Sequence, residues 1–329
     1  MDEFTPDLSD FSGVISVRRG DAVLGEWAVG LADRTAGAAN TPDTRFGLAS
    51  GTKTFTALTV LSLIGDGDLA LDTPARDVLG ADLPLIAAEV TVDHLLTHTS
   101  GIGDYLDEEV DALAPLTIPV QKLDSTGAYL PMLDGLPTKF PAGERFSYCN
   151  GGYVVLAVIA ERIAGTPFAD LVAQRVFAPA EMAASGFPRS DLLPPGTATG
   201  YKTDGRSNVF ELPVVGSGDG GAHSTVADLH RFWLALLSGR IVDPTLVAVA
   251  TETVTADAGD GLGYGRGVWL DDGELVIAGG DHGVTAVSRH DPATSTTVSA
   301  LANIEVPTFA RARATMEAVR ARSGVGGAE

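Results

Sequence analysis

Alternating apolar and polar residues open the chain at 13–19 and 25–30, on either side of Gly20-Asp21. Alternation with a period of two predicts half-buried strands, and a glycine-containing turn between two such runs predicts a hairpin. Near the other end of the chain, runs rich in β-branched residues predict strands at 267–270, 275–278, 284–289 and 296–302. Strands at both ends of the sequence favour one antiparallel sheet built from both termini.

Helical patterns fill most of the sequence between these strands. Broad apolar faces and capping residues such as Thr91 predict helices at 50–64, 92–97, 151–165, 224–237 and 307–322. We therefore expect an α/β (α+β) protein with one continuous catalytic domain. Residues 1–65 and 215–329 are expected to form an α/β sandwich subdomain, and residues 66–214 a mainly helical one. The active cleft is expected between the two parts.

The chain is strongly acidic, because 43 Asp and Glu residues against 22 Lys and Arg residues give a net charge of -21. A surface of this sign repels nucleic-acid phosphates and anionic membranes, so neither is expected as a partner. The N-terminus lacks the basic and apolar regions of a signal peptide, and the apolar runs fall short of the ~20 residues of a membrane span. We therefore expect a cytoplasmic protein. Cys149 is the only cysteine and cannot form an intramolecular disulfide.

Two short motifs carry the candidate chemistry. Ser50 precedes Lys53 by three residues at the start of an apolar helix, so one helical turn places both side chains on the same face. The helix N-terminus adds a positive field that favours a developing alkoxide. Tyr148 and Asn150 are one residue apart, and on extended backbone their side chains point to the same side. A nucleophile needs a base and an orienting group, and these four residues supply a candidate for each role.

With these motifs, the chain resembles the serine β-lactamase-like family, which includes class C β-lactamases, DD-peptidases, and related esterases and D-aminopeptidases. The resemblance covers nearly the whole length. Other segments in family-like order are LALDTP at 69–74, HLLTHTSG at 94–101, PAGERFSY at 141–148 and GGAHST at 220–225.

The resemblance implies a β-lactamase/DD-peptidase-like fold: an antiparallel sheet flanked by helices plus an all-helical subdomain. It also implies acyl transfer through a serine ester, without a cofactor or a metal. Carried over to this sequence, Ser50 is the nucleophile and Lys53 holds or accepts its proton. Tyr148 is the general base, with its phenolate favoured by Lys53, and Asn150 orients Lys53 and the substrate. The backbone N–H of Ser50 is one donor of the oxyanion hole.

The third motif of the family, Lys-Thr-Gly or His-x-Gly, has no clear counterpart. One register places Ile277-Ala278-Gly279 in this slot, with Gly280 as the second oxyanion-hole donor and no cation. A shifted register places His282 near the slot, and both registers stay open. Gly220 stands where cephalosporinases carry an aromatic wall, which implies a wider cleft. The candidates for the substrate pocket are Gly279, His282 and Gly220.

Because a cation at the third motif normally meets a substrate carboxylate, its absence weakens the preference for β-lactams and stem peptides. We therefore expect a serine hydrolase that acts on a small ester, an amide or a short peptide, esterase-like or D-amino-acid-peptidase-like. The alternative is a β-lactamase or DD-carboxypeptidase, that is, a relative of the penicillin-binding proteins. A third hypothesis is a non-enzymatic binding protein. The acyl group, the leaving group and the oligomeric state stay open.

Other residues suggest different chemistry less strongly. His94 and His98 are four apart, as zinc ligands on a helix can be, but no third ligand is evident. Residues 216–221 match G-x-G-x-x-G without the surrounding βαβ units of a dinucleotide site, so a glycine-rich loop lining the cleft is expected. Cys149 is expected to point away from Tyr148 and Asn150 into the core, where a thiol is usually inert.

Overall fold

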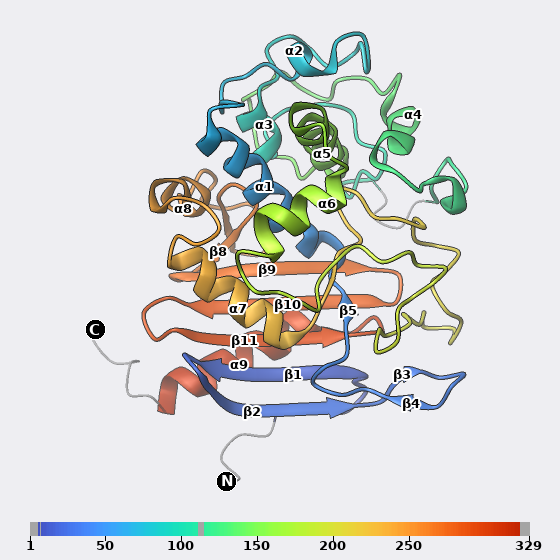
Figure 1. Ribbon diagram of the computed structural model, residues 1–329, viewed down its shortest axis with the longest axis vertical. Helices are drawn as coiled ribbons and strands as arrows, with labels where there is room; N and C mark the ends of the chain where they lie inside the picture. The colour runs from blue at the N-terminus through green and yellow to red at the C-terminus, as the bar shows by residue number, and fades with distance from the viewer. Residues whose placement is uncertain (1–5, 7, 111–114, 323–329) are drawn as a thin grey trace.

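The computed structural model describes residues 6, 8–110 and 115–322 and is built around one seven-stranded antiparallel sheet (Figure 1). The strand order is β2-β1-β11-β10-β9-β8-β7, so that N-terminal and C-terminal segments lie side by side. This confirms the antiparallel sheet expected from both ends of the sequence. The strands of the sheet are β1 (Gly13–Arg19), β2 (Ala22–Val29), β7 (Gly263–Tyr264), β8 (Trp269–Asp271), β9 (Glu274–Asp281), β10 (Val284–Asp291) and β11 (Thr296–Ala302).

Two small two-stranded sheets, nine α-helices and four short 3-10 or π-helices complete the described part of the chain. The short strands are β3 (Leu31–Asp33), β4 (Ala38–Ala39), β5 (Phe46–Gly47) and β6 (His223–Ser224). The α-helices are α1 (Thr52–Asp66), α2 (Ala75–Leu79), α3 (Val92–Leu96), α4 (Leu130–Leu133), α5 (Asn150–Ala164), α6 (Phe168–Val172), α7 (Val226–Leu237), α8 (Pro244–Thr251) and α9 (Thr308–Arg322). Thr91 caps α3 and the left-handed Gly165 ends α5, as their sequence positions predict.

Helices cover both faces of the sheet, and the alternation of side chains along each strand decides what each face contacts. Ile15 and Val17 of β1 pack in one apolar cluster with Ala312 and Met316 of α9. Val14 precedes Ile15 and points to the opposite face of the sheet, where it belongs to the large cluster that includes α1, α5 and α7. Figure 1 shows α7 in front of the sheet and α9 behind it. Side chains also alternate between the two faces along β9, and this alternation decides which of them face the candidate site.

The upper part of the molecule is helical, with α2, α3, α4 and α5 gathered above the sheet (Figure 1). Helix α1 joins it to the sheet, because α1 packs against α5 and its residues 52–63 are buried throughout. A helix buried on all sides has no polar face, which accounts for the broad apolar pattern at 50–64.

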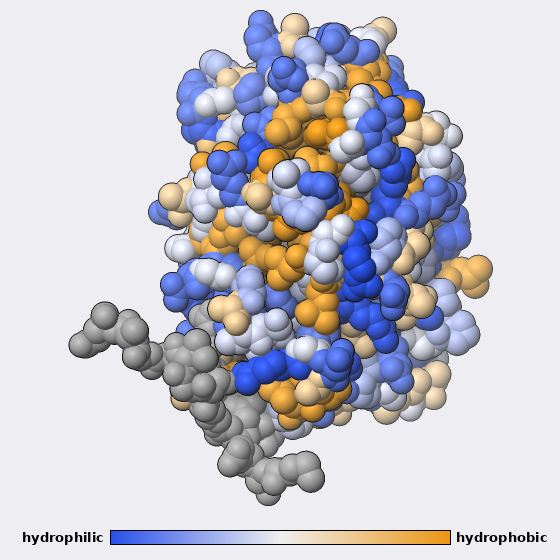
Figure 2. All heavy atoms as spheres, turned by 60° about the vertical axis from the view of Figure 1, so that its left-hand side comes forward, coloured by the Kyte–Doolittle hydropathy of each residue, from blue (hydrophilic) through white to orange (hydrophobic). Residues whose placement is uncertain are grey.

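Hydrophilic side chains cover much of the face shown in Figure 2, with apolar patches between them. A dispersed polar surface of this kind agrees with the scattered acidic residues of the sequence. None of the helices in the described part of the chain combines the length and the apolar character needed to cross a bilayer.

Phe55 of α1 provides a test of the core. Its side chain is fully buried and meets the rings of Phe177 and Phe232 edge-on, with centroids 5.1 Å away in both cases. We expect Phe55→Ala to lower the free energy of unfolding by about 3–5 kcal/mol, because it leaves a cavity in a packed aromatic cluster. Phe210→Ala is the control: Phe210 is 83% exposed, and its loss is expected to change stability by about 0.5 kcal/mol or less. Urea unfolding followed by circular dichroism measures both, and equal effects would contradict this view of the core.

Candidate active site

Ser50 lies in a 3-10 turn, Ala49–Gly51, that leads directly into α1. Ala49 has a φ of +45°, in the left-handed region that costs a residue other than glycine roughly 1–2 kcal/mol. Strain of this kind persists only where the surrounding structure imposes it. One turn later, the amine of Lys53 donates a hydrogen bond to Ser50 Oγ over 3.0 Å. The helical spacing of the two residues therefore brings them into contact.

Lys53 is buried and has three hydrogen-bond acceptors around its amine. Besides Ser50 Oγ, these are Asn150 Oδ1 at 2.8 Å and the backbone carbonyl of Asp219 at 2.9 Å. Burial lowers the pKa of Lys53 from its ordinary value of 10.5, although the negative charges of Asp219, Glu108 and Asp104 oppose the shift. A lysine with a lowered pKa has a larger neutral fraction near neutral pH and can accept a proton.

Asn150 is the first residue of α5, so the expectation that it lies on extended backbone beside Tyr148 is wrong. The reason is a capping arrangement: the carboxylate of Asp104 accepts hydrogen bonds from the N–H groups of Asn150 (2.6 Å) and Gly151 (2.8 Å). Two of the unsatisfied donors at the helix N-terminus are thereby paired. The amide nitrogen of Asn150 donates to Leu106 O (2.9 Å) and to Glu108 (3.2 Å), which fixes the amide oxygen toward Lys53.

Tyr148 lies between two rings, with centroids 4.3 Å from that of His98 and 6.0 Å from that of Trp269. Lys53 Nζ is 4.9 Å from the centre of the Tyr148 ring. Burial, and next the charge of Glu108, raises the pKa of Tyr148 well above 10, and a hydrogen bond with Ser50 opposes the shift only in part. The expected phenolate, favoured by Lys53, is therefore not supported, because burial and nearby carboxylates both favour the neutral phenol.

His98 and Cys149 are buried next to Tyr148 and help to hold it in position. His98 is buried with Nδ1 accepting a hydrogen bond from the N–H of Cys149 (3.0 Å) and Nε2 lying 3.2 Å from the Tyr264 hydroxyl. The Cys149 thiol is buried, caps α5 through Gly152, and has a pKa raised by burial, as an inert cysteine does.

His94 has a separate role from His98, since its Nδ1 accepts a hydrogen bond from Thr91 in the cap of α3. The two histidines do not converge. Within residues 6, 8–110 and 115–322, no group of three or more His, Cys, Asp or Glu side chains is arranged to hold a metal ion.

Strand β9 lies against the turn that carries Ser50. A Cβ atom added to Gly279 would stand 2.1 Å from Leu48 O and 2.7 Å from the backbone nitrogen of Ser50. Ile277, on the same face of the strand, is buried beneath Gly51 and supplies no cation to the cleft. His282 lies in the turn that follows β9. This geometry favours the register with Ile277-Ala278-Gly279 in the third-motif slot and puts Gly280 next to the nucleophile's turn.

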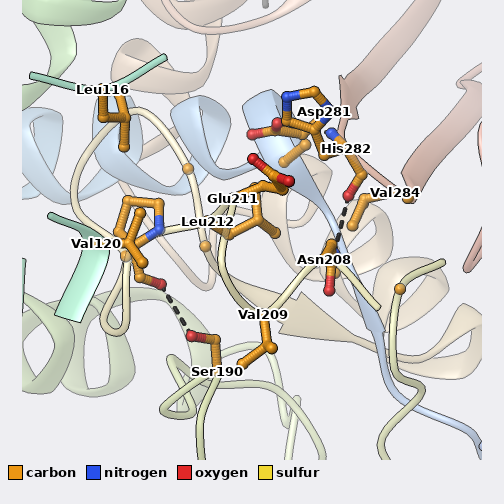
Figure 3. A pocket seen from close by; sticks show the side chains of 18 of the residues that line it. Leu116, Val120, Ser190, Asn208, Val209, Glu211, Leu212, Asp281, His282 and Val284 are labelled. Atoms are coloured by element: carbon orange, nitrogen blue, oxygen red, sulfur yellow. Dashed lines mark hydrogen bonds between the residues drawn. The ribbon is translucent and has the colours of Figure 1, made fainter. Parts of the chain in front are cut away.

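A cleft of about 1010 Å³ opens over Ser50 and Asn150. Figure 3 shows Asp281, His282 and Val284 on one side of it and Leu116 and Val120 on the other. The glycine-rich segment expected at the cleft does line it, through residues 216 and 219–221, and Gly280 and His282 line it as well. Gly279 does not, because it faces the turn of Ser50.

Sequence reasoning did not assign the roles of three acidic residues in the site. The loop residue Asp219 offers its carbonyl to Lys53, and its carboxylate accepts a hydrogen bond from the hydroxyl of Tyr105. Asp104 and Glu108 position Asn150. Asp104 and Tyr105 follow the HLLTHTSG segment closely, and this position is the sequence signal that could have found them. For the backbone carbonyl of Asp219, no side-chain pattern exists.

A family model described as Beta-lactamase matches residues 2–322. The chain belongs to the beta-lactamase family. Penicillin-binding protein 4* of Bacillus subtilis (strain 168) is 31% identical over 276 residues, which cover 79% of this chain and 59% of that protein. Esterase EstB of Burkholderia gladioli is 37% identical over 183 residues, covering 53% and 46%. This member of the beta-lactamase family thus spans about half the length of these two relatives.

A solved structure agrees with the family assignment. The penicillin-binding protein from Bacillus halodurans superposes with a TM-score of 0.87 at 35% identity, covering 95% of this chain and 98% of that one. The β-lactamase-like fold, with its antiparallel sheet and flanking helices, is therefore confirmed for this family member.

Gly279 provides a test of the close approach between β9 and the nucleophile's turn. We expect Gly279→Ala to lower the free energy of unfolding by about 1–3 kcal/mol, because the atoms that a methyl group would meet are backbone atoms of Leu48 and Ser50. Gly280→Ala is the matched control for stability, since a Cβ there meets nothing within 4 Å. Chemical denaturation of both variants measures the difference. A Gly279→Ala protein as stable as Gly280→Ala would show that β9 does not press on this turn.

Proposed function

We propose that the protein is a serine hydrolase that cleaves esters or amides through an acyl-enzyme on Ser50. The observation that carries this proposal is the 3.0 Å contact between a buried lysine amine and a serine hydroxyl at the edge of a cleft. Esters, amides and short peptides are of a size that this cleft accepts. The esterase and the penicillin-binding protein among the relatives support the same reaction class.

In the proposed acylation step, Ser50 Oγ attacks the substrate carbonyl while its proton passes to the neutral amine of Lys53. Asn150 Oδ1 and the carbonyl of Asp219 hold the amine in place as it gains charge. The N–H groups of Ser50 and Gly280 are the proposed donors to the oxyanion, and each such donor is worth roughly 3–4 kcal/mol of transition-state stabilisation in comparable sites. Tyr148 stays neutral and relays the proton to the leaving group, instead of acting as a phenolate base.

In the second step, water attacks the acyl-enzyme, and its proton returns through Tyr148 and Lys53 as Ser50 regains its hydroxyl. Both steps use only groups of this chain, so the proposal needs no cofactor or metal.

The second candidate function is that of a β-lactamase or DD-carboxypeptidase, which the similarity to penicillin-binding proteins favours. The charge of the residues that line the cleft disfavours this second function. No lysine or arginine is among the described residues that line the cleft, and Ile277 stands where a cation would meet a substrate carboxylate. Turnover of nitrocefin as fast as that of a simple ester would reverse this preference. A cytoplasmic location, and the division into subdomains 1–65 with 215–329 and 66–214, remain part of the proposal.

We expect Ser50→Ala to lower the hydrolysis of p-nitrophenyl acetate at least about a thousandfold, because the acyl-enzyme cannot form. A fluorophosphonate is expected to label the wild-type protein once, with the adduct mapping to Ser50 in peptide mass spectrometry. Ser62→Ala is the control: this serine lies further along α1 and bonds to Thr59 O, outside the cleft. Hydrolysis that survives in Ser50→Ala, or an adduct on another residue, would refute the assignment.

A further inference from the structure

The cleft has a one-sided charge. Six of its lining residues are acidic: Glu108, Asp191, Glu211, Asp219, Asp281 and Glu305. None of the lining residues that the structure describes is a lysine or an arginine. Two of the acids are neutralised from outside the cleft, since Asp191 pairs with Arg189 (3.0 Å) and Glu211 with Lys202 (2.5 Å). The other four form no ion pair with a lysine or an arginine in the described part of the chain.

Asp281 is the acid best placed to meet a substrate. Ile277 and Gly279 of β9 face the turn of Ser50, and the period of two puts Asp281 on that same face. The ladder with β10 continues to the pair of Asp281 and Val284, so the alternation holds to the end of the strand. Gly280, the proposed oxyanion-hole donor, is its direct neighbour. The side chain thus lies one step along the strand from the reacting carbonyl.

The Asp281 side chain is half-buried and has no lysine or arginine partner among the described residues. It accepts a hydrogen bond from the N–H of His282 (2.7 Å) and has no cationic partner at bonding distance among the described residues. Its pKa is raised to about 6, first by burial and also by the charge of Asp219, while Lys53 and His282 oppose the shift. A carboxylate buried in this way is stabilised by a cation that enters the cleft.

The side of the cleft opposite Asp281 is mainly apolar, and the acid beside it, Glu211, is paired with Lys202. Leu116, Ile118 and Val120 form it, with Val209 and Leu212 beside them, and Figure 3 shows Leu116 and Val120 across from Asp281. A ligand that suits both walls has an apolar body and one positive group.

From this geometry we propose that Asp281 binds an ammonium group of the substrate, so that the cleft selects cationic esters or amides over neutral and anionic ones. The inference rests on the proposed hydrolase function and assigns its substrate class. A field of one sign in a low-dielectric cleft also raises the encounter rate of the oppositely charged substrate.

Matched substrates test this selection at pH 7, where Asp281, with a pKa of about 6, is mostly ionised and an α-ammonium group is still mostly protonated. In the first series the charge is on the acyl side: alanine p-nitroanilide, in both enantiomers, against its N-acetyl and N-succinyl twins. In the second series the charge is on the leaving group: acetylthiocholine against 3,3-dimethylbutyl thioacetate, its uncharged carbon analogue. We expect kcat/KM to favour the cationic member by about 10- to 100-fold in at least one series, the range of a charged hydrogen-bonded contact. The series that responds identifies the side that carries the ammonium group.

Asp281→Asn is expected to lower this cation-to-neutral ratio of kcat/KM at least about tenfold, because it keeps the shape of the side chain and removes its charge. Asp191→Asn is the matched control and should leave the ratio unchanged, since Arg189 already neutralises that acid. If Asp281→Asn does not fold, a measurement on the wild-type protein still tests the inference. In the wild-type protein, added NaCl should lower kcat/KM for the cationic substrate and not for its neutral twin.

No cation preference in either series, a preference that folded Asp281→Asn leaves unchanged, or a preference in the wild-type protein that salt does not reduce would overturn the inference. The proposed hydrolase function fails separately. It fails if neutral p-nitrophenyl acetate is not hydrolysed at Ser50, whereas Ser50-dependent hydrolysis without cation preference overturns only the role of Asp281.

Discussion

The burial of one amine is the constraint on which the rest of the site depends. Lys53 Nζ lies between Ser50 Oγ, Asn150 Oδ1 and the Asp219 carbonyl, three acceptors that match the three hydrogens of an ammonium group. A neutral amine fits the same place, because it can donate two of these hydrogen bonds and accept the third from the serine hydroxyl. The position therefore holds both protonation states with little rearrangement. That property is what a group needs in order to take a proton from Ser50 and later return it.

Two opposing effects set the charge of this amine. Burial disfavours the ammonium form, and the carboxylates of Asp219, Glu108 and Asp104 favour it. These carboxylates also have structural roles. Asp104 caps α5 and Glu108 holds the amide of Asn150, so the fold places negative charge beside Lys53 for reasons of its own. Burial, together with these same charges, raises the pKa of Tyr148 well above 10, which favours the proposed roles of Lys53 as the base and of the neutral phenol as a proton relay.

Much of this arrangement follows from short-range patterns in the sequence. The alternation in 13–19 and the β-branched residues of 296–302 predict strands of one sheet built from both termini, and β1 and β11 do pair in that sheet. The three-residue spacing of Ser50 and Lys53 predicts their contact, because the geometry of a helix turn is fixed locally. The motif resemblance led to Asn150, although its backbone is helical and not extended.

Features that depend on distant segments were beyond sequence reasoning. The pKa of Tyr148 reflects rings and carboxylates from four separate parts of the chain. The carbonyl of Asp219 is a backbone atom, whose direction depends on how a glycine-rich loop folds against α1. The register of the third motif could be chosen only from the position of β9 in the fold. The contact between Gly279 and the turn of Ser50 is what distinguishes the two registers.

The most direct test of this account is the protonation state of Lys53 itself. Nitrogen-15 NMR of lysine-labelled protein, with the Lys53 resonance assigned by its absence in Lys53→Arg, follows the titration of this one amine. The account predicts a midpoint below the ordinary 10.5 in the free protein, so that the neutral base is present at the pH of turnover. A midpoint at or above 10.5 would contradict it, because Lys53 would then be a permanent cation and could not take the proton of Ser50.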